Sequence, residues 1–235
     1  MLAKSGDAVS LVCTPAALVS YCTIVVALAA PPVQTVADGK EVLEAYATTT
    51  SSEPVSLLVR VRVGSNPAKV FATKTKGDRL IVTGDLVLSD DGNEAILYAR
   101  VTCNATEEQF LNEVLVVGRL SSTAKVTESA KSCSRSVAVN RRVNGNDLTD
   151  WYRVRGYGYS MEKLKEMPKG ALVSVSGTLE QRINRQGDPY LEIKARNLRV
   201  HSKPKSGPDL AAGTTATGYS HADFTGESDM PHDWN

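Results

Sequence analysis

The sequence predicts an all-β protein that contains two copies of one small barrel, followed by an acidic polar tail. Three observations lead to this prediction. Residues 76–86 and 169–179 share a Lys-Gly start, a valine, a glycine and a final leucine, which indicates an internal repeat. Apolar and polar residues alternate in much of the sequence around both segments, as they do in half-buried strands. Charge is also divided unevenly along the chain.

The composition is that of a globular protein. Of the 235 residues, 42% are hydrophobic and 23% are charged, which excludes a collagen, a disulfide miniprotein and a disordered chain. The net charge of +1 hides an uneven distribution. Residues 1–109 hold 9 basic and 12 acidic side chains, and residues 110–205 hold 18 basic and 9 acidic ones. Residues 206–235 hold 5 acidic side chains and no Lys or Arg. A basic middle beside an acidic end predicts a polyanion-binding domain and an interaction tail. A solvated basic face is the alternative.

The first copy is expected at residues 20–105, after an N-terminal extension of residues 1–19. Its opening stretch from Thr23 to Ala30 imitates the end of a signal peptide, but Asp7, Pro15 and Ser20 interrupt the apolar run. We therefore expect a strand there. Three segments of the first copy can be laid against the second: 23–29 against 114–120, 76–86 against 169–179, and 96–101 near 190–198.

The second copy is expected at residues 110–201, and its elements can be placed in order. Alternation predicts strands at 114–118, 134–139, 151–159, 171–179 and 190–200. Residues 161–167 have helical spacing and stop at Pro168-Lys169-Gly170. Five strands with one short helix between the third and the fourth is the element order of the oligonucleotide-binding (OB) barrel. The sequence therefore predicts two tandem five-stranded OB-fold barrels.

One strand of the second copy carries residues suited to single-stranded nucleic acid, which needs flat rings for its bases and cations for its phosphates. In a strand, one face would present Trp151, Arg153, Arg155, Tyr157 and Tyr159. The alternative is that the rings fill the barrel core, although two arginines on the same face make this harder. Two hairpin tips, 141–147 and 181–187, would add Arg141, Arg142, Arg182 and Arg185 to a basic groove. An ordinary solvated loop is the alternative for either tip.

From Asn112 to Val200 the sequence resembles the bacterial single-stranded DNA-binding protein family. The resemblance is carried by residues 114–120, 137–142, 149–154, 169–170 and 177–179, in that order. It implies a protein without enzymatic activity that binds and protects single-stranded DNA during replication, recombination and repair. Trp151 and Tyr157 fall at base-stacking positions of the family. Two other such positions fall near Val143 and Asn184, which are not aromatic and cannot stack. The first copy has no such aromatic strand at 55–63, so we expect it to serve assembly or weak binding.

The tail, residues 202–235, is rich in small polar residues from Ser206 onward and is expected to be disordered. Its tip resembles the acidic tip by which the same family recruits replication and repair proteins. The residues that this resemblance assigns to partner binding are Asp229, Met230, Pro231, Asp233 and Trp234. A plain solubilising tail is the alternative.

Other function classes find little support in the sequence. Cys13, Cys22, Cys103 and Cys133 are spaced too irregularly for a zinc site, so we expect reduced, partly buried thiols. No metal or cofactor motif, nucleophile elbow or P-loop is present, and no enzymatic activity is expected.

We expect a cytoplasmic, nucleoid-associated protein without membrane contact. The family's usual assembly has four barrels, which implies a homodimer here. The competing hypothesis is a structural protein whose aromatic strand is an oligomer interface.

Overall fold

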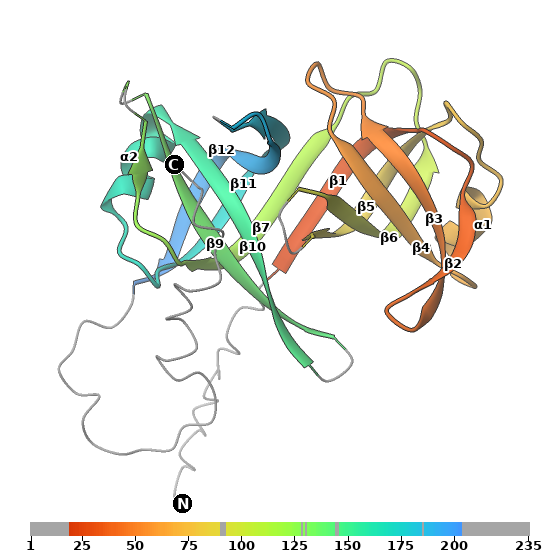
Figure 1. The fold of residues 1–235 in the computed structure, drawn as a ribbon, viewed down its shortest axis with the longest axis horizontal. Coiled ribbons are helices and arrows are strands. Elements are labelled where there is room, and N and C mark those ends of the chain that lie inside the picture. The colour runs from red at the N-terminus through yellow and green to blue at the C-terminus, as the bar shows by residue number, and fades with distance from the viewer. Residues whose placement is uncertain are drawn as a thin grey trace, which may run out of the picture.

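The computed structural model describes residues 19–89, 93–127, 129, 131–143, 146–184 and 186–203. Within these ranges the chain is mostly β-strand, and it forms two barrels that lie side by side (Figure 1). The predicted all-β class is confirmed. The N-terminal extension up to residue 18 and the tail from residue 204 lie outside the described residues, and so does the expectation of a disordered tail.

The first barrel contains five long strands and a short helix between the third and the fourth of them. A small additional strand, β2, forms a hairpin with β3. The elements are β1 (Val19–Leu28), β2 (Val33–Ala37), β3 (Lys40–Thr49), β4 (Ser56–Arg62), α1 (Asn66–Phe71), β5 (Arg79–Leu88) and β6 (Ala95–Asn104). The apolar stretch that imitates a signal peptide is therefore part of a buried strand, β1.

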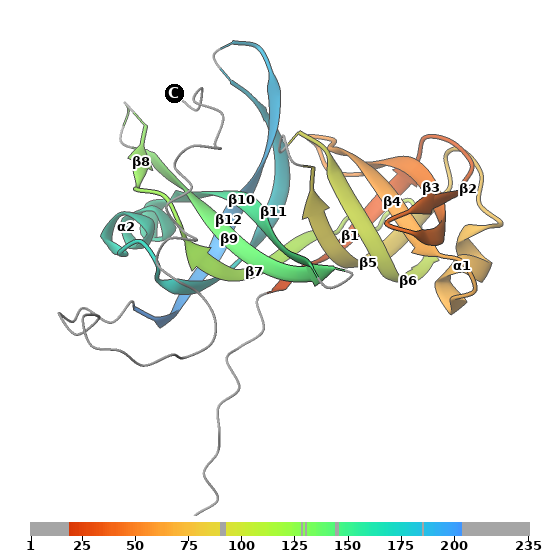
Figure 2. The same ribbon diagram turned by 60° about the horizontal axis from the view of Figure 1, so that its bottom comes forward.

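The second barrel repeats the same order of elements. Its additional strand, β8, has only two residues and pairs with β9. The elements are β7 (Asn112–Leu120), β8 (Lys125–Val126), β9 (Ser132–Val143), β10 (Asn146–Tyr157), α2 (Gly158–Glu166), β11 (Leu172–Ile183) and β12 (Pro189–Ser202). The hairpin of β11 and β12 extends well beyond the barrel (Figure 2).

Both barrels are closed by the same set of strand pairings. In the first, β1 pairs with β3 and β5, β3 with β4, and β5 with β6, while β4 and β6 pair in parallel. In the second, β7, β9, β10, β12 and β11 take the corresponding places, with β10 and β12 parallel. The predicted five-stranded OB topology is confirmed in both halves.

Glycines of the sequence repeat occupy matching places in the two barrels. Gly77 and Gly170 have φ values of 90° and 85°, which favour glycine in the turn before the fourth long strand. Gly84 and Gly177 lie at matching β-bulges, where an added Cβ would come within 2.1 Å of the Tyr98 carbonyl oxygen and 2.0 Å of the Lys194 carbonyl oxygen. The repeat therefore marks positions where the backbone itself requires glycine.

The register corrects one part of the sequence alignment. Ala27 pairs with Arg79, and Arg119 pairs with Leu172, which is the residue equivalent to Arg79 in the repeat. Ala27 is therefore equivalent to Arg119, whereas the sequence alignment placed it against Gly118. The sequence alignment is thus wrong by one residue. Because side chains alternate between the two faces of a sheet, this error assigns the buried residues of the strand to the exposed face.

The two barrels are joined into a continuous sheet. Strands β1 and β7 pair antiparallel, from Val19 opposite Val117 to Ile24 opposite Asn112. Next to this seam the carbonyl oxygen of Leu86 accepts two hydrogen bonds, from the Ser20 hydroxyl and from the Tyr152 hydroxyl, both at 2.5 Å. Tyr152 belongs to β10 of the second barrel, so the strand that carries the aromatic residues is anchored to the first barrel.

Helix α2 begins earlier than the sequence predicts. Strand β10 ends at Tyr157, and Gly158, with a φ of 50°, starts the helix, so Tyr159 lies in α2 and not in the strand. Buried Arg135 of β9 holds the other end of this helix, because its guanidinium donates to the carbonyl oxygens of Ser122, Leu164 and Met167.

Among the helices described, none is long and apolar enough to span a membrane.

Candidate nucleic-acid interface

The outer face of β10 presents alternating rings and guanidinium groups. Tyr152 and Val154 point into the barrel and are buried, which turns the intervening residues outward. Trp151 is 42% exposed and Tyr157 is 40% exposed, with Arg153 and Arg155 between them. Large rings that fill a core would be buried, so the exposure of these two favours a surface role over the core alternative.

The neighbouring strand β9 places only small residues beside this face. Ala138 lies opposite Trp151, Ser136 opposite Arg153, Ser134 opposite Arg155 and Ser132 opposite Tyr157. Directly opposite residues of an antiparallel pair share one face of the sheet. Ser134 and Ser136, opposite the two arginines, are partly exposed, whereas Ala138 and Ser132, opposite the two rings, are buried. Small side chains therefore border the row of rings and cations on this side.

On the other side, β12 supplies a tyrosine that organises the arginines. The Arg153 guanidinium lies 4.4 Å from the centre of the Tyr190 ring, which is cation–π geometry. Arg155 donates a hydrogen bond of 3.0 Å to the Tyr190 hydroxyl. Burial lowers the pKa of Arg153, and the nearby Tyr190 and Glu192 offset this only in part. Tyr190 thus fixes both guanidinium groups of the face.

A fully buried carboxylate, Glu192, lies at the centre of the cluster. Arg155 donates to it at 2.8 Å and Arg182 at 3.3 Å. Burial alone would lower the pKa of Arg155, but Glu192 and the nearby tyrosines together outweigh it, so the pKa of Arg155 is raised. A similar balance raises the pKa of Arg182, for which Glu180 opposes the effect of burial most strongly. These cations are therefore partly neutralised within the protein.

Arg182 also connects the two barrels. Besides Glu192 it pairs with Glu180, and it lies 3.7 Å from Glu53 in the loop between β3 and β4 of the first barrel. Lys194 pairs with the same Glu180 at 3.2 Å and lies 5.8 Å from the centre of the Tyr157 ring. Arg182 and Lys194 thus border the aromatic row, each beside an acidic partner.

Sequence reasoning missed Tyr190, Glu192 and Lys194. A signal was present, because these three residues alternate along one strand and so share a face, as the residues of β10 do. The parallel pairing of Arg155 with Lys194 brings the two strands together. This pairing joins residues far apart in the chain, and alternation alone does not indicate it.

Two of the predicted site residues lie away from this face. Arg141 pairs with buried Asp150 at 2.6 Å. Asp150 directly precedes outward-facing Trp151, and Arg141 is three residues after Ala138, the residue opposite Trp151. Because side chains alternate along a strand, the Arg141–Asp150 pair lies on the opposite face of the β9–β10 hairpin from Trp151. Tyr159 is 74% exposed on α2, and the Lys163 ammonium lies 4.5 Å from its ring centre. The helix therefore takes this tyrosine out of the row that the sequence placed it in.

The remaining predicted site residues lie outside what the structure describes. These are the side chain of Arg142, all of Arg185, and the five tip residues Asp229, Met230, Pro231, Asp233 and Trp234. The backbone of Arg142 pairs with Asp147 near the end of the β9–β10 hairpin. The roles of all these residues stay predictions.

The first barrel lacks the aromatic row. Arg60 pairs with Tyr98 as Arg155 pairs with Lys194, and the matching glycine bulges fix this equivalence. Ser56 therefore stands where the second barrel has Trp151, and Arg62 where it has Tyr157. Arg60 is bound to Glu44 at 2.7 Å. The first barrel therefore keeps the arginine of the face, with Tyr98 beside it in place of Lys194, but not the rings of Trp151 and Tyr157.

Metal-ligating side chains are not clustered within the described ranges. Among them, no group of three or more His, Cys, Asp or Glu side chains is arranged to hold one. The three cysteines within the described ranges are free thiols: Cys22 and Cys133 are buried and Cys103 is exposed. Burial raises the pKa of the Cys22 thiol, which keeps it protonated.

Comparisons with known proteins agree with this fold. Residues 111–200 match the model of the Single-strand binding protein family. The wild-type single-stranded DNA binding protein from Thermus aquaticus has a similar structure, with a TM-score of 0.58 and 19% identity over 86% of this chain and 100% of that chain. A deletion mutant of the same Thermus protein has a TM-score of 0.58 and 17% identity, over 83% of this chain and 100% of that chain. No curated protein sequence matches the chain.

Proposed function

We propose that this protein binds single-stranded DNA on the outer face of β10, within the segment that matches the single-strand binding protein family. Bases stack on Trp151 and Tyr157, and Arg153 and Arg155 contact the phosphates between them. The observation that carries the proposal is the row of half-exposed rings and arginines beside the small residues of β9. No step of this function requires a catalytic residue.

Fluorescence provides the direct test. The chain has two tryptophans, so a Trp234→Phe variant leaves Trp151 as the only indole. Oligo-dT is expected to quench its emission as bases stack on the ring. Quenching that depends on protein dilution and not on oligo-dT would instead support the hypothesis of an oligomer interface. Oligo-U in parallel measures the preference between DNA and RNA.

Salt is expected to weaken this binding strongly. The logarithm of the affinity for oligo-dT should fall with the logarithm of salt concentration, with a slope of roughly −0.7 for each phosphate neutralised. Titrations at several salt concentrations measure the slope. Affinity that does not change with salt would contradict the phosphate contacts.

The acidic tip is proposed to recruit replication and repair proteins, in the cytoplasm at the nucleoid. Deleting residues 229–235 should abolish capture of such partners from a bacterial lysate and leave oligo-dT affinity intact or slightly higher at low salt. The reason is that a tethered acidic segment competes with DNA for a basic face. Much weaker DNA binding by the truncated protein would contradict this division of roles.

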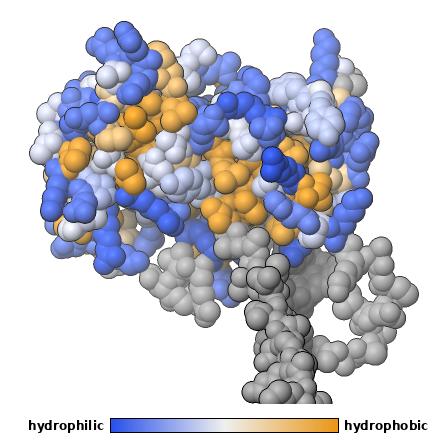
Figure 3. Space-filling view, turned by 180° about the vertical axis from the view of Figure 1, so that it is seen from behind, coloured by the Kyte–Doolittle hydropathy of each residue, from blue (hydrophilic) through white to orange (hydrophobic). Residues whose placement is uncertain are grey.

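We also expect a homodimer, because the back of the molecule leaves apolar side chains uncovered. Figure 3 shows them in two areas among hydrophilic ones. Exposed apolar residues on the outer face of the joined sheet include Val101 of β6 and Leu115 of β7. A second copy could cover such a surface. The mass in solution, measured by light scattering, tests this expectation.

A further inference from the structure

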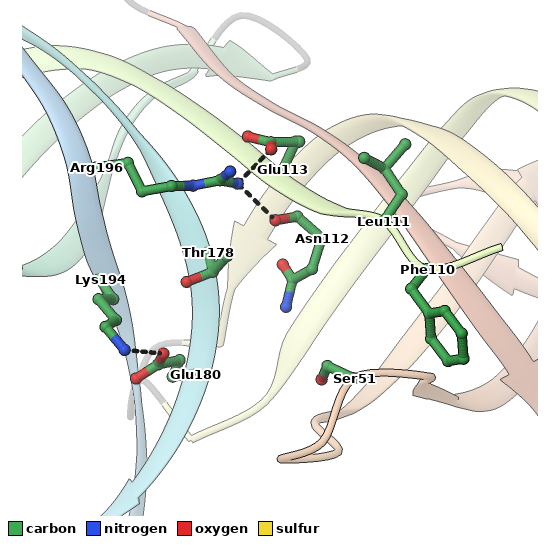
Figure 4. A pocket seen from close by; sticks show the side chains of 9 residues that line it. All are labelled: Ser51, Phe110, Leu111, Asn112, Glu113, Thr178, Glu180, Lys194 and Arg196. Atoms are coloured by element: carbon green, nitrogen blue, oxygen red, sulfur yellow. Dashed lines mark hydrogen bonds and ion pairs between the residues drawn. The ribbon is translucent and has the colours of Figure 1, made fainter.

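A cleft of about 430 Å³ lies where the two barrels meet. Its lining comes from the β3–β4 loop, the linker between the barrels (residues 105–111), and strands β7, β11 and β12. Phe110 and Leu111 of the linker lie across the opening from Lys194 and Arg196 of β12 (Figure 4). The volume is within the range of small-ligand sites.

Phe110 carries an aromatic ring that is largely exposed to solvent. It is 67% exposed, and the Arg79 guanidinium lies 5.3 Å from its ring centre. Arg79 also donates to the Gln109 carbonyl oxygen at 2.7 Å, and the Val25 N–H donates to the Leu111 carbonyl oxygen at 2.8 Å. The backbone is therefore fixed on both sides of a ring that contributes little to the core, which is the arrangement of a preorganised stacking surface.

The two cations of the cleft, Lys194 and Arg196, are each about half exposed to water. Lys194 pairs with Glu180, and Arg196 pairs with Glu113. The Arg196–Glu113 pair is exposed on both sides, at 51% and 44%, and such pairs contribute little to stability, so a phosphate can replace Glu113 at little cost. Glu180 is only 13% exposed, but about half of the Lys194 side chain is open to water, so Lys194 can contact a phosphate while it keeps this partner. Lys194 also borders Tyr157, which makes the cleft continuous with the outer face of β10.

We propose that this cleft is a second subsite for single-stranded nucleic acid, in which Phe110 stacks on a base and Lys194 and Arg196 contact the adjoining phosphates. The inference rests on the proposed function and extends it. A strand that leaves Tyr157 passes Lys194 and enters the cleft. The linker and the first barrel thereby take part in binding, although the first barrel has no aromatic row of its own.

The test compares two lengths of oligo-dT. One OB fold covers about 4 to 16 nucleotides, so an oligomer of about 8 can be held by β10 alone, and one of about 30 can reach the cleft. Phe110→Ala is expected to weaken binding of the longer oligomer by about fivefold or more, because it removes the stacking surface for one base. Binding of the shorter oligomer should not change. Phe110→Trp, which keeps a stacking ring, should restore the affinity.

Controls separate the two proposals. Val36→Ala removes an exposed apolar side chain on β2, outside the cleft, and should change neither affinity. If Phe110→Ala binds the longer oligomer as tightly as the unchanged protein does, the second subsite is overturned while the interface on β10 stands. If the unchanged protein binds neither oligomer, the proposed function fails as well.

Discussion

Trp151→Ala and Tyr157→Ala are each expected to lower oligo-dT affinity by about 1 to 3 kcal/mol, which is roughly 5-fold to 150-fold. Both rings are partly exposed on the outer face of β10, so their loss removes stacking surface without opening a cavity in the barrel. Fluorescence anisotropy of a labelled oligo-dT measures the affinity. Thermal unfolding should show little change.

Tyr46→Ala is the matched control for this pair. Tyr46 is 56% exposed on β3 of the first barrel, which lacks the aromatic row. Its substitution should leave affinity nearly unchanged. If Trp151→Ala and Tyr157→Ala both fail to fold, the rings belong to the core and the proposed interface is wrong.

The barrels could be predicted from the sequence because their signals are local. Strand alternation, the helix stop at Pro168 and the repeated glycines each depend on a few neighbouring residues. The glycines were informative because the bulges at Gly84 and Gly177 exclude a Cβ. The outward face of β10 followed from the same two-residue period, and the structure places the rings of Trp151 and Tyr157 on it.

The rest of the site depends on contacts between distant segments. The sequence could not indicate that Glu192 is buried between Arg155 and Arg182, because that requires the parallel pairing of β10 with β12. Arg141 was misplaced for a related reason: its hairpin was treated as a basic loop, whereas strand pairing continues past Arg141 and directs it to the opposite face. Tyr159 was misplaced by extending the alternation beyond the end of β10, into the start of the helix.

Glu192→Leu is expected to destabilise the fold by about 3 to 5 kcal/mol. It removes a buried carboxylate and leaves the guanidinium groups of Arg155 and Arg182 without their shared partner. Glu192→Gln keeps the shape and a hydrogen-bond acceptor, so it should lose less stability. Chemical denaturation of the two variants beside the unchanged protein measures the difference.

The same position tests whether Glu192 competes with DNA. In Glu192→Gln the two arginines lose an anionic partner, so oligo-dT affinity should rise at low salt. The slope of log affinity against log salt concentration should steepen by the amount expected for about one more phosphate contact. Glu162→Gln is the control, since it removes an equal charge from an exposed ion pair on α2. Equal tightening in both variants would indicate a general charge effect. Weaker binding by a folded Glu192→Gln would instead mean that Glu192 positions the arginines for their phosphates.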